Sequence, residues 1–150
     1  MVYKLPSVRK IVTEINRISI EPDEHSNIED AKIVVSVGNG IKNRETLKQI
    51  YRFTELIGGT VGCSRRVVES GWFPHSRQVG QSGKTVSPDI YIAIGISGAS
   101  QHLAGMKTSA KIIAVNSDRN ADIFSVADIG FVMDAKLWLK RSIEILERNL

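Results

Sequence analysis

Short apolar runs recur along the chain from residue 33 onward, and each run ends at small or polar residues. Most of these runs are apolar throughout rather than alternating with polar residues, which is typical of strands buried on both faces of a parallel sheet. The pattern predicts five strands, at residues 33–37, 60–63, 90–94, 111–115 and 129–133.

Between these runs, apolar positions recur at helical spacing or polar residues supply helix caps. Asn43 is expected to begin a helix that ends at Gly58 and Gly59, and Ser64 to cap a short helix. Further helices are expected at about residues 99–106 and 120–126. A last helix should begin at Asp134 and carry one apolar stripe, made of Leu139, Ile143, Leu146 and Leu150.

Regular alternation of strand and helix predicts an α/β protein. The expected fold is a doubly wound, Rossmann-like, mostly parallel sheet of five to six strands with helices on both faces. Residues 1–32 follow a different pattern, because the short alternating piece Ile18-Ser19-Ile20 leads into Pro22 and a run of acidic residues. We therefore expect an N-terminal strand and linker at residues 1–32 and a folded domain at residues 33–150.

Composition narrows the possible functions without changing the fold. No apolar run approaches the roughly 20 residues of a membrane helix, so membrane insertion is not expected. The single cysteine, Cys63, fits a small buried strand residue, and the three histidines lack a second ligand at metal spacing. The net charge of +4 is spread along the chain without a nucleic-acid-binding motif, so neither a metal nor a nucleic acid is expected.

Polar and small residues follow every predicted strand. Ligands bind beyond the carboxyl ends of strands in open parallel sheets, so these residues predict a crevice for a polar, phosphorylated ligand. Arg65 and Arg66 add weight, because cations are disfavoured in the first turn of a helix unless an anion or a flat ring lies there. For each residue singly, a role as a turn, cap or surface residue remains an alternative.

Two enzyme motifs in residues 79–102 are incomplete. A phosphate loop of the type G-x4-G-K-[ST] needs glycine where the chain has Gln78, and a serine nucleophile elbow needs glycine where it has Ala99. Neither an ATPase nor a serine hydrolase is therefore expected. The remaining strand, glycine-rich turn and helix could hold a pyrophosphate on backbone N–H groups, with His102 one turn further along.

The same residues resemble a known family. The stretch "GQSGKTVSPDIYIAIGISGASQHLAGM", with "SRRVVESGWFPHSRQVGQSGK" before it and "IIAVNSDRNADIFSVADIGFVMD" after it, resembles the FAD-binding domain of the electron transfer flavoprotein alpha subunit. The resemblance covers residues 33–150 and implies that residues 1–32 are the tail of a preceding domain. It implies an electron carrier without catalytic residues of its own, in the cytoplasm or the mitochondrial matrix.

The resemblance also implies partners and a cofactor. The cofactor would be FAD, and the partner would be an electron transfer flavoprotein beta subunit. Electrons would pass from dehydrogenases or NADH to a quinone oxidoreductase or another acceptor. Arg65 would lie over the isoalloxazine ring, Ser82 near its N5 and O4 atoms, and His102 near its C2 carbonyl. The full set of implied cofactor-binding residues is Asn39, Ser64, Arg65, Val79, Gly80, Gln81, Ser82, Ser97, Gly98, Ala99, Ser100, Gln101, His102, Asn116, Asp134 and Ala135.

One position departs from the family pattern. Asn39 stands where many members carry an arginine at the phosphate end of the cofactor, so weaker retention of FAD is expected. An assembly module of the same fold without a cofactor therefore stays open. An NAD-binding α/β enzyme domain is a second alternative, because related folds bind NAD with similar loops. The neighbouring aromatic residues Trp72 and Phe73 fit either core packing or contact with a partner.

Overall fold

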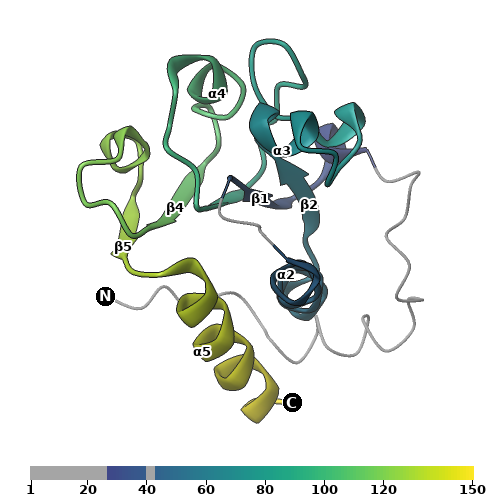
Figure 1. Ribbon diagram of the computed structural model, residues 1–150, viewed down its shortest axis with the longest axis vertical. Coiled ribbons are helices and arrows are strands. Elements are labelled where there is room, and N and C mark those ends of the chain that lie inside the picture. Colours follow the sequence, from purple (N-terminus) through teal and green to yellow (C-terminus); the bar gives the residue numbers. More distant parts are fainter. Residues whose placement is uncertain (1–26, 40–42) are drawn as a thin grey trace.

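Five parallel strands form the centre of the computed structural model, which describes residues 27–39 and 43–150 (Figure 1). The strands are β1 (Ile33–Val37), β2 (Thr60–Cys63), β3 (Ile90–Ile94), β4 (Lys111–Asn116) and β5 (Ile129–Val132). The helices are η1 (Ile28–Asp30), α2 (Arg44–Ile57), α3 (Arg65–Glu69), η2 (His75–Arg77), α4 (Ser100–Ala104), η3 (Asp122–Ser125) and α5 (Ala135–Arg148).

The order of the strands across the sheet is β2-β1-β3-β4-β5. The chain therefore builds outward from β1 to β2 on one side and then from β3 to β5 on the other. This order confirms the predicted doubly wound, Rossmann-like α/β fold. The strand order reverses between β1 and β3, whose last residues, Val37 and Ile94, are paired in register. The edge strand expected at residues 18–20 lies outside the described residues.

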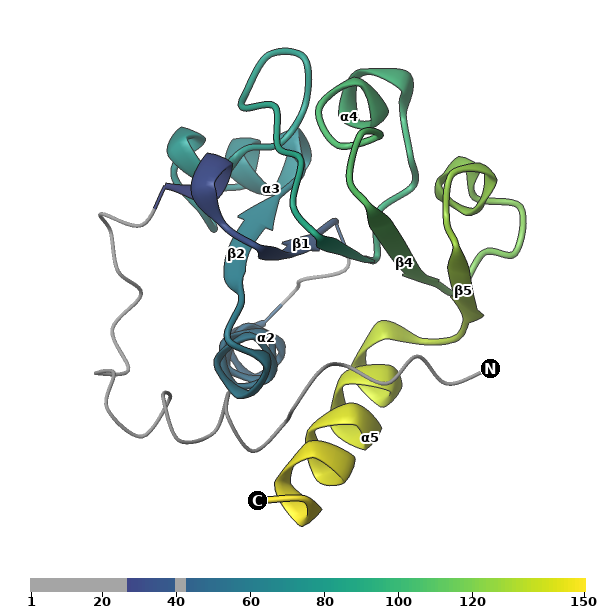
Figure 2. The ribbon, with the colours of Figure 1, turned by 180° about the vertical axis from the view of Figure 1, so that it is seen from behind.

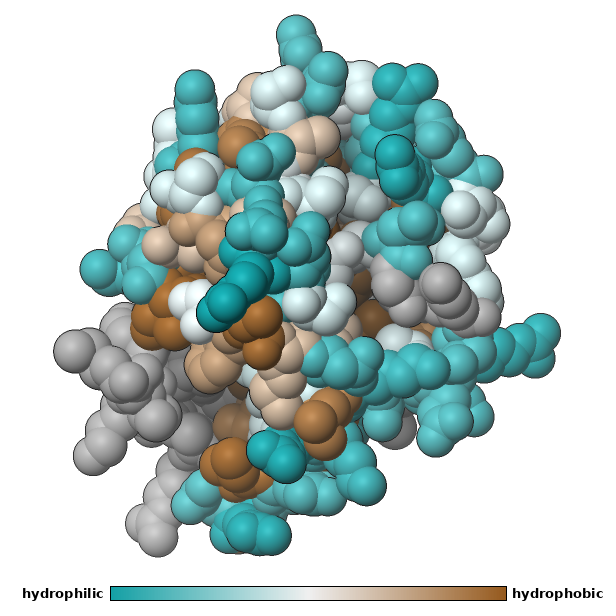
Figure 3. Space-filling model, turned by 60° about the vertical axis from the view of Figure 1, so that its left-hand side comes forward, coloured by the Kyte–Doolittle hydropathy of each residue, from teal (hydrophilic) through white to brown (hydrophobic). Residues whose placement is uncertain are grey.

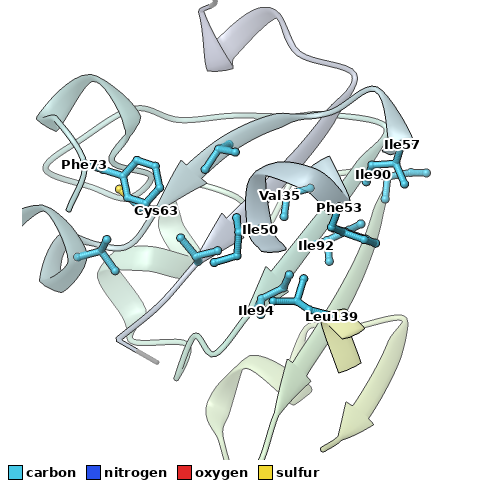
Figure 4. Packing of buried hydrophobic residues seen from close by; sticks show 13 residues of the cluster. Val35, Ile50, Phe53, Ile57, Cys63, Phe73, Ile90, Ile92, Ile94 and Leu139 are labelled. Atoms are coloured by element: carbon cyan, nitrogen blue, oxygen red, sulfur yellow. The ribbon is translucent and has the colours of Figure 1, made fainter. Parts of the chain in front are cut away.

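Helices α2 and α5 cover one face of the sheet, and both views show them together on that side (Figures 1 and 2). Their buried residues, including Ile50, Phe53 and Leu139, pack against Val35 and Ile92 of the sheet (Figure 4). The predicted stripe of α5 is correct except at its end. Leu150 follows the helix and is 58% exposed, because the chain ends beyond the sheet that the stripe covers.

Shorter elements cover the other face. Ile28 of η1, Met106 after α4 and Ile123 of η3 pack on Tyr91 and Ala114 of the sheet. Helices on both faces were expected, but the segment at residues 120–126 is a single 3₁₀ turn, and α4 is shorter than the predicted 99–106. Helix α4 ends early because the chain turns at Gly105, whose carbonyl accepts a hydrogen bond from the Val86 N–H.

Predicted caps begin both long helices. The Asn43 side chain accepts a hydrogen bond from the Thr46 N–H at 2.9 Å, and Asp134 accepts one from the Leu137 N–H at 3.0 Å. Each bond satisfies an N–H group that the helix itself leaves unpaired. Ser64 occupies the cap position of α3, but its side chain makes no capping bond.

Apolar side chains are unevenly distributed over the surface. Phe73 and Cys63 are buried, and Trp72 packs against the same core, so core packing is the correct choice for this aromatic pair. The side of the molecule that carries β5 shows hydrophobic residues among polar ones (Figure 3), and Phe131 and Val132 of β5 are exposed there. Among the described residues, none of the helices has the length and hydropathy of a membrane span.

Candidate functional site

A cleft of about 360 Å³ lies where the strand order reverses, beyond the carboxyl ends of β1, β2 and β3. This is the position at which open α/β sheets bind ligands. The cleft is lined by Gly38, Asn39, Ser64, Arg65, Arg66, Gln78, Val79, Gly80, Gln81, Ser82, Gly95, Ile96, Ser97, Gly98, Ala99, Gln101 and His102.

Glycines let the loops after β1 and β3 touch at the base of the cleft. The Gly38 N–H donates to the Ile94 carbonyl at 2.8 Å, and a Cβ atom on Gly38 would overlap the Gly95 carbonyl. Any larger residue at position 38 would force the two loops apart. The sequence therefore needs glycine here for close backbone approach rather than for an unusual φ.

The turn after β3 presents unpaired backbone donors. Gly95 and Gly98 have φ values of 67° and 91°, in the left-handed region that glycine tolerates. The N–H groups of Ser97, Gly98 and Ala99 donate to no acceptor among the described residues. Successive unpaired N–H groups in a turn form a concavity that favours anions. Helix α4 has only five residues, so these turn amides rather than a helix dipole provide the attraction.

The loop at residues 78–84 forms another wall of the cleft. Val79 donates its N–H to the Cys63 carbonyl at 2.9 Å, and Gln81 donates to the Gln101 carbonyl at 2.8 Å. These bonds join the loop to β2 on one side and to α4 on the other. Gly80 lies against Gly105, where a Cβ atom would overlap the Gly80 backbone. The loop is therefore held in place without regular secondary structure.

Ser82 is oriented by two neighbours. The Gln78 side-chain amide donates to the Ser82 hydroxyl oxygen at 2.8 Å, and His75 Nε2 lies 3.0 Å from the Ser82 carbonyl oxygen. Because Gln78 uses an acceptor site of the hydroxyl, the Ser82 O–H remains able to donate. Sequence reasoning singled out Gln78 only as the residue that breaks a phosphate-loop motif. Nothing in a single sequence indicates that this amide is buried, with 3% exposure.

His102 is the most deeply buried titratable side chain of the cleft, at 7% exposure. Its Nε2 lies 2.8 Å from the Tyr91 hydroxyl, and its Nδ1 makes no hydrogen bond of normal geometry with the described residues, although the Val79 backbone lies close enough to act on the ring. Burial lowers the pKa of His102 to about 4, and the Val79 backbone opposes this shift only in part. The imidazole is therefore neutral at pH 7, and it can act on a ligand through a hydrogen bond rather than through a positive charge.

Arg65 lines the cleft from α3, and its side chain is 70% exposed. Its Nε donates to Glu69 Oε1 at 2.8 Å, one helical turn further along. Exposed ion pairs of this kind contribute little to stability, so Glu69 holds the guanidinium only weakly. The side chain can thus serve either as a surface ion pair or as a group that lies over a ligand.

Four of the predicted cofactor-binding residues lie outside the lining of this cleft. Asn116 donates from its Nδ2 to the Ile96 carbonyl at 2.9 Å, so it fixes the turn after β3 from behind. Asp134 caps α5 and borders a separate hollow between α2 and α5. Ser100 and Ala135 are likewise absent from the cleft lining. Contact of these four residues with a cofactor therefore stays a prediction.

Comparison with known proteins agrees with this geometry. Residues 27–107 match the family model described as the electron transfer flavoprotein FAD-binding domain, a range that contains every residue lining the cleft. The chain belongs to this family. The match favours the FAD-binding domain over both alternatives, the NAD-binding enzyme domain and the module without a cofactor.

Curated relatives of this FAD-binding domain come from distant organisms. The mitochondrial electron transfer flavoprotein subunit alpha of Dictyostelium discoideum is 45% identical over 88% of the chain and 38% of the relative. The electron transfer flavoprotein subunit alpha of Pseudomonas aeruginosa is 54% identical over 69% of the chain and 34% of the relative. Protein FixB of Clostridium saccharobutylicum is 51% identical over 73% and 33%. The chain thus spans between a third and two fifths of these relatives.

Proposed function

We propose that the cleft binds FAD and that the chain carries electrons as part of an electron transfer flavoprotein. The observation that carries this proposal is the pairing, in one cleft, of turn amides and of a buried imidazole nitrogen, Nδ1 of His102, that find no hydrogen-bond partner within residues 27–39 and 43–150. FAD has a pyrophosphate for the first and a ring with carbonyl acceptors for the second. Bound FAD would supply the capacity to take up and release electrons.

The residues of the cleft divide into two groups by chemistry. The N–H groups of Ser97, Gly98 and Ala99 would hold the pyrophosphate, because they are unpaired donors in a concave turn. Ser82 and His102 would donate hydrogen bonds to the ring, and Arg65 would lie over it. Each such bond can alter the electron affinity of the ring, since hydrogen bonds and charges are the means by which a protein tunes a flavin.

The proposed partners follow from the relatives rather than from the cleft. Relatives named electron transfer flavoprotein subunit alpha support pairing of this chain with a beta subunit. We also propose that electrons arrive from a dehydrogenase or NADH and leave to a quinone oxidoreductase or another acceptor, in the cytoplasm or the mitochondrial matrix. In such a carrier the chain would turn over no substrate of its own.

A binding measurement tests the cofactor. The purified chain, dialysed against FAD at tens of micromolar and then freed of unbound flavin, is expected to keep a flavin absorption band with altered fine structure. Riboflavin, which lacks the phosphates, serves as the matched ligand and should bind more weakly. No bound flavin before or after refolding in FAD would contradict the proposal, and tighter binding of NAD than of FAD would favour the enzyme alternative.

A further inference from the structure

Tyr91 is a large side chain with no exposed surface, and it is the second residue of β3. It points to the face of the sheet that η1, α4 and η3 cover, and its hydroxyl is the hydrogen-bond partner of His102 Nε2 at 2.8 Å. The other strand residues of this core are apolar, and Ser36 is a buried polar residue of the neighbouring strand β1. A phenol in this position places a polar group directly behind the imidazole of the cleft.

The direction of the Tyr91–His102 hydrogen bond follows from which of the buried groups can donate a proton and which can accept one. A neutral imidazole carries one N–H donor and one acceptor nitrogen, and a buried phenol O–H needs an acceptor. Burial raises the pKa of Tyr91, and Ser36 lies close enough to the phenol to oppose this shift in part. The Ser36 hydroxyl nevertheless makes no hydrogen bond of normal geometry with the described residues. If Tyr91 donated to Ser36, the Ser36 proton would have no acceptor among the described residues.

We propose that Tyr91 donates its hydroxyl proton to Nε2 of His102 and thereby fixes the imidazole as the neutral Nδ1–H tautomer. Tyr91 is then a positioning residue, and it gives a fixed direction to the Nδ1–H donor of a residue that lines the cleft. The ligand atom that faces Nδ1 must be an acceptor, such as a carbonyl oxygen or an unprotonated ring nitrogen. That this acceptor belongs to FAD rests on the proposed function, whereas the tautomer itself does not.

The tautomer decides whether the contact between Nδ1 and the ligand is attractive or repulsive. With the proton on Nε2, the bare Nδ1 lone pair would face the acceptor of the ligand and repel it, although the charge of the ring would be unchanged. Burial of His102 excludes water that could otherwise bridge two acceptors. Loss of the phenol should therefore weaken binding of the ligand several-fold, because only the fraction of molecules that keeps the Nδ1–H tautomer binds it well.

Nitrogen-15 NMR of the histidine-labelled chain at pH 7, without FAD, tests the tautomer directly. The wild-type spectrum, assigned with His102→Gln, is expected to show a protonated Nδ1 and an unprotonated Nε2. In Tyr91→Phe the two nitrogens should move toward a mixture of tautomers. Tyr51→Phe is the matched control, since Tyr51 packs on Phe73 in the core on the other face of the sheet, and it should leave the His102 signals unchanged.

A protonated Nε2 in the wild-type chain would overturn the proposal, and this measurement decides even if Tyr91→Phe does not fold. An unchanged tautomer in a folded Tyr91→Phe variant would overturn it as well. Titration with FAD forms the second arm, in which Tyr91→Phe should raise the dissociation constant several-fold and Tyr51→Phe should not. Absence of FAD binding to the wild type would reject the proposed function while leaving the tautomer result intact.

Discussion

Asn39 is the residue of the cleft that departs from the family pattern, and it is an exposed residue of the lining. An arginine at this position would add a cation and several donors where the pyrophosphate is proposed to lie. We expect Asn39→Arg to lower the FAD dissociation constant by roughly tenfold, since charge-assisted hydrogen bonds contribute about 1.5–3 kcal/mol and exposure reduces this.

The charge change of Asn39→Arg needs a control. Asn149→Arg adds the same charge at the end of α5, away from the cleft, and should leave the dissociation constant unchanged. The gain should also shrink as salt rises, because exposed charges are screened. Isothermal titration of both variants at low and high salt measures these effects, and equal affinity of Asn39→Arg and wild type would show that position 39 does not contact the phosphates.

Single residues show where sequence reasoning succeeds and where it stops. The capping roles of Asn43 and Asp134 depend on neighbours three residues away, so local sequence was sufficient to predict them. The partner of Tyr91 is His102, in a different element, and this contact depends on how α4 packs on β3. From sequence alone, Tyr91 was one more residue in an apolar strand.

The loops after β1 and β3 form the base of the cleft, and their contact depends on Gly38. Gly38→Ala would place a methyl group on the Gly95 carbonyl, which belongs to backbone and cannot rotate away. We expect a loss of about 2–4 kcal/mol in the free energy of unfolding, typical of severe overpacking, together with weaker FAD binding. Urea unfolding and FAD titration measure the two effects.

Gly71→Ala is the matched control for the loop contact. Gly71 has a φ of 81°, but a Cβ atom there would meet nothing within 4 Å. This variant should lose only the backbone cost of a left-handed alanine, about 1–2 kcal/mol, and should bind FAD as the wild type does. If Gly38→Ala kept full FAD affinity, contact between the two loops would be unnecessary for the site.

Helices and strands were predictable where the local sequence pattern determines them, and less so where tertiary contacts do. Most strands appeared as apolar runs because a sheet covered on both faces requires such residues along its central strands, whereas residues of the edge strand β5 are exposed. Helix α4 ended earlier than predicted because of tertiary contacts at Gly105, which accepts a hydrogen bond from the Val86 N–H and packs on Gly80. The loop at residues 78–84 has an ordered structure that no periodic sequence pattern predicts, because its backbone hydrogen bonds are made with β2 and α4.

The arrangement of the whole molecule was predictable only as a class. Alternating elements indicate a doubly wound sheet, but apolar periodicity carries no information on which strands are neighbours. The order β2-β1-β3-β4-β5 places the turns that begin at Gly38 and Gly95 side by side, and this juxtaposition creates the cleft. The pattern of elements therefore predicted a crevice at the carboxyl edge of the sheet, and the family resemblance assigned individual residues of that edge to a cofactor.

Burial of His102 should couple the stability of the whole fold to pH. The pKa falls from 6.5, the ordinary value, to about 4 in the folded chain, where desolvation disfavours the charged ring. The contribution of His102 to the free energy of unfolding is therefore complete above pH 6.5 and is lost as pH falls toward 4. The reason is that the unfolded chain binds a proton at this ring in that range, whereas the folded chain does not. Between pH 7 and pH 5 this difference amounts to about 2 kcal/mol.

Urea unfolding at pH 7 and pH 5 isolates the contribution of His102 when variants are compared. His102→Gln removes the titrating ring, so its free energy of unfolding should fall by about 2 kcal/mol less than that of the wild type over this range. Ser100→Ala is the matched control, because Ser100 is an exposed residue of the same helix without a titrating side chain, and this variant should keep the full wild-type loss. Equal losses in His102→Gln and wild type would contradict this prediction. They would mean that the imidazole gains a proton in the folded state as readily as in the unfolded chain, although the ring is buried against Tyr91.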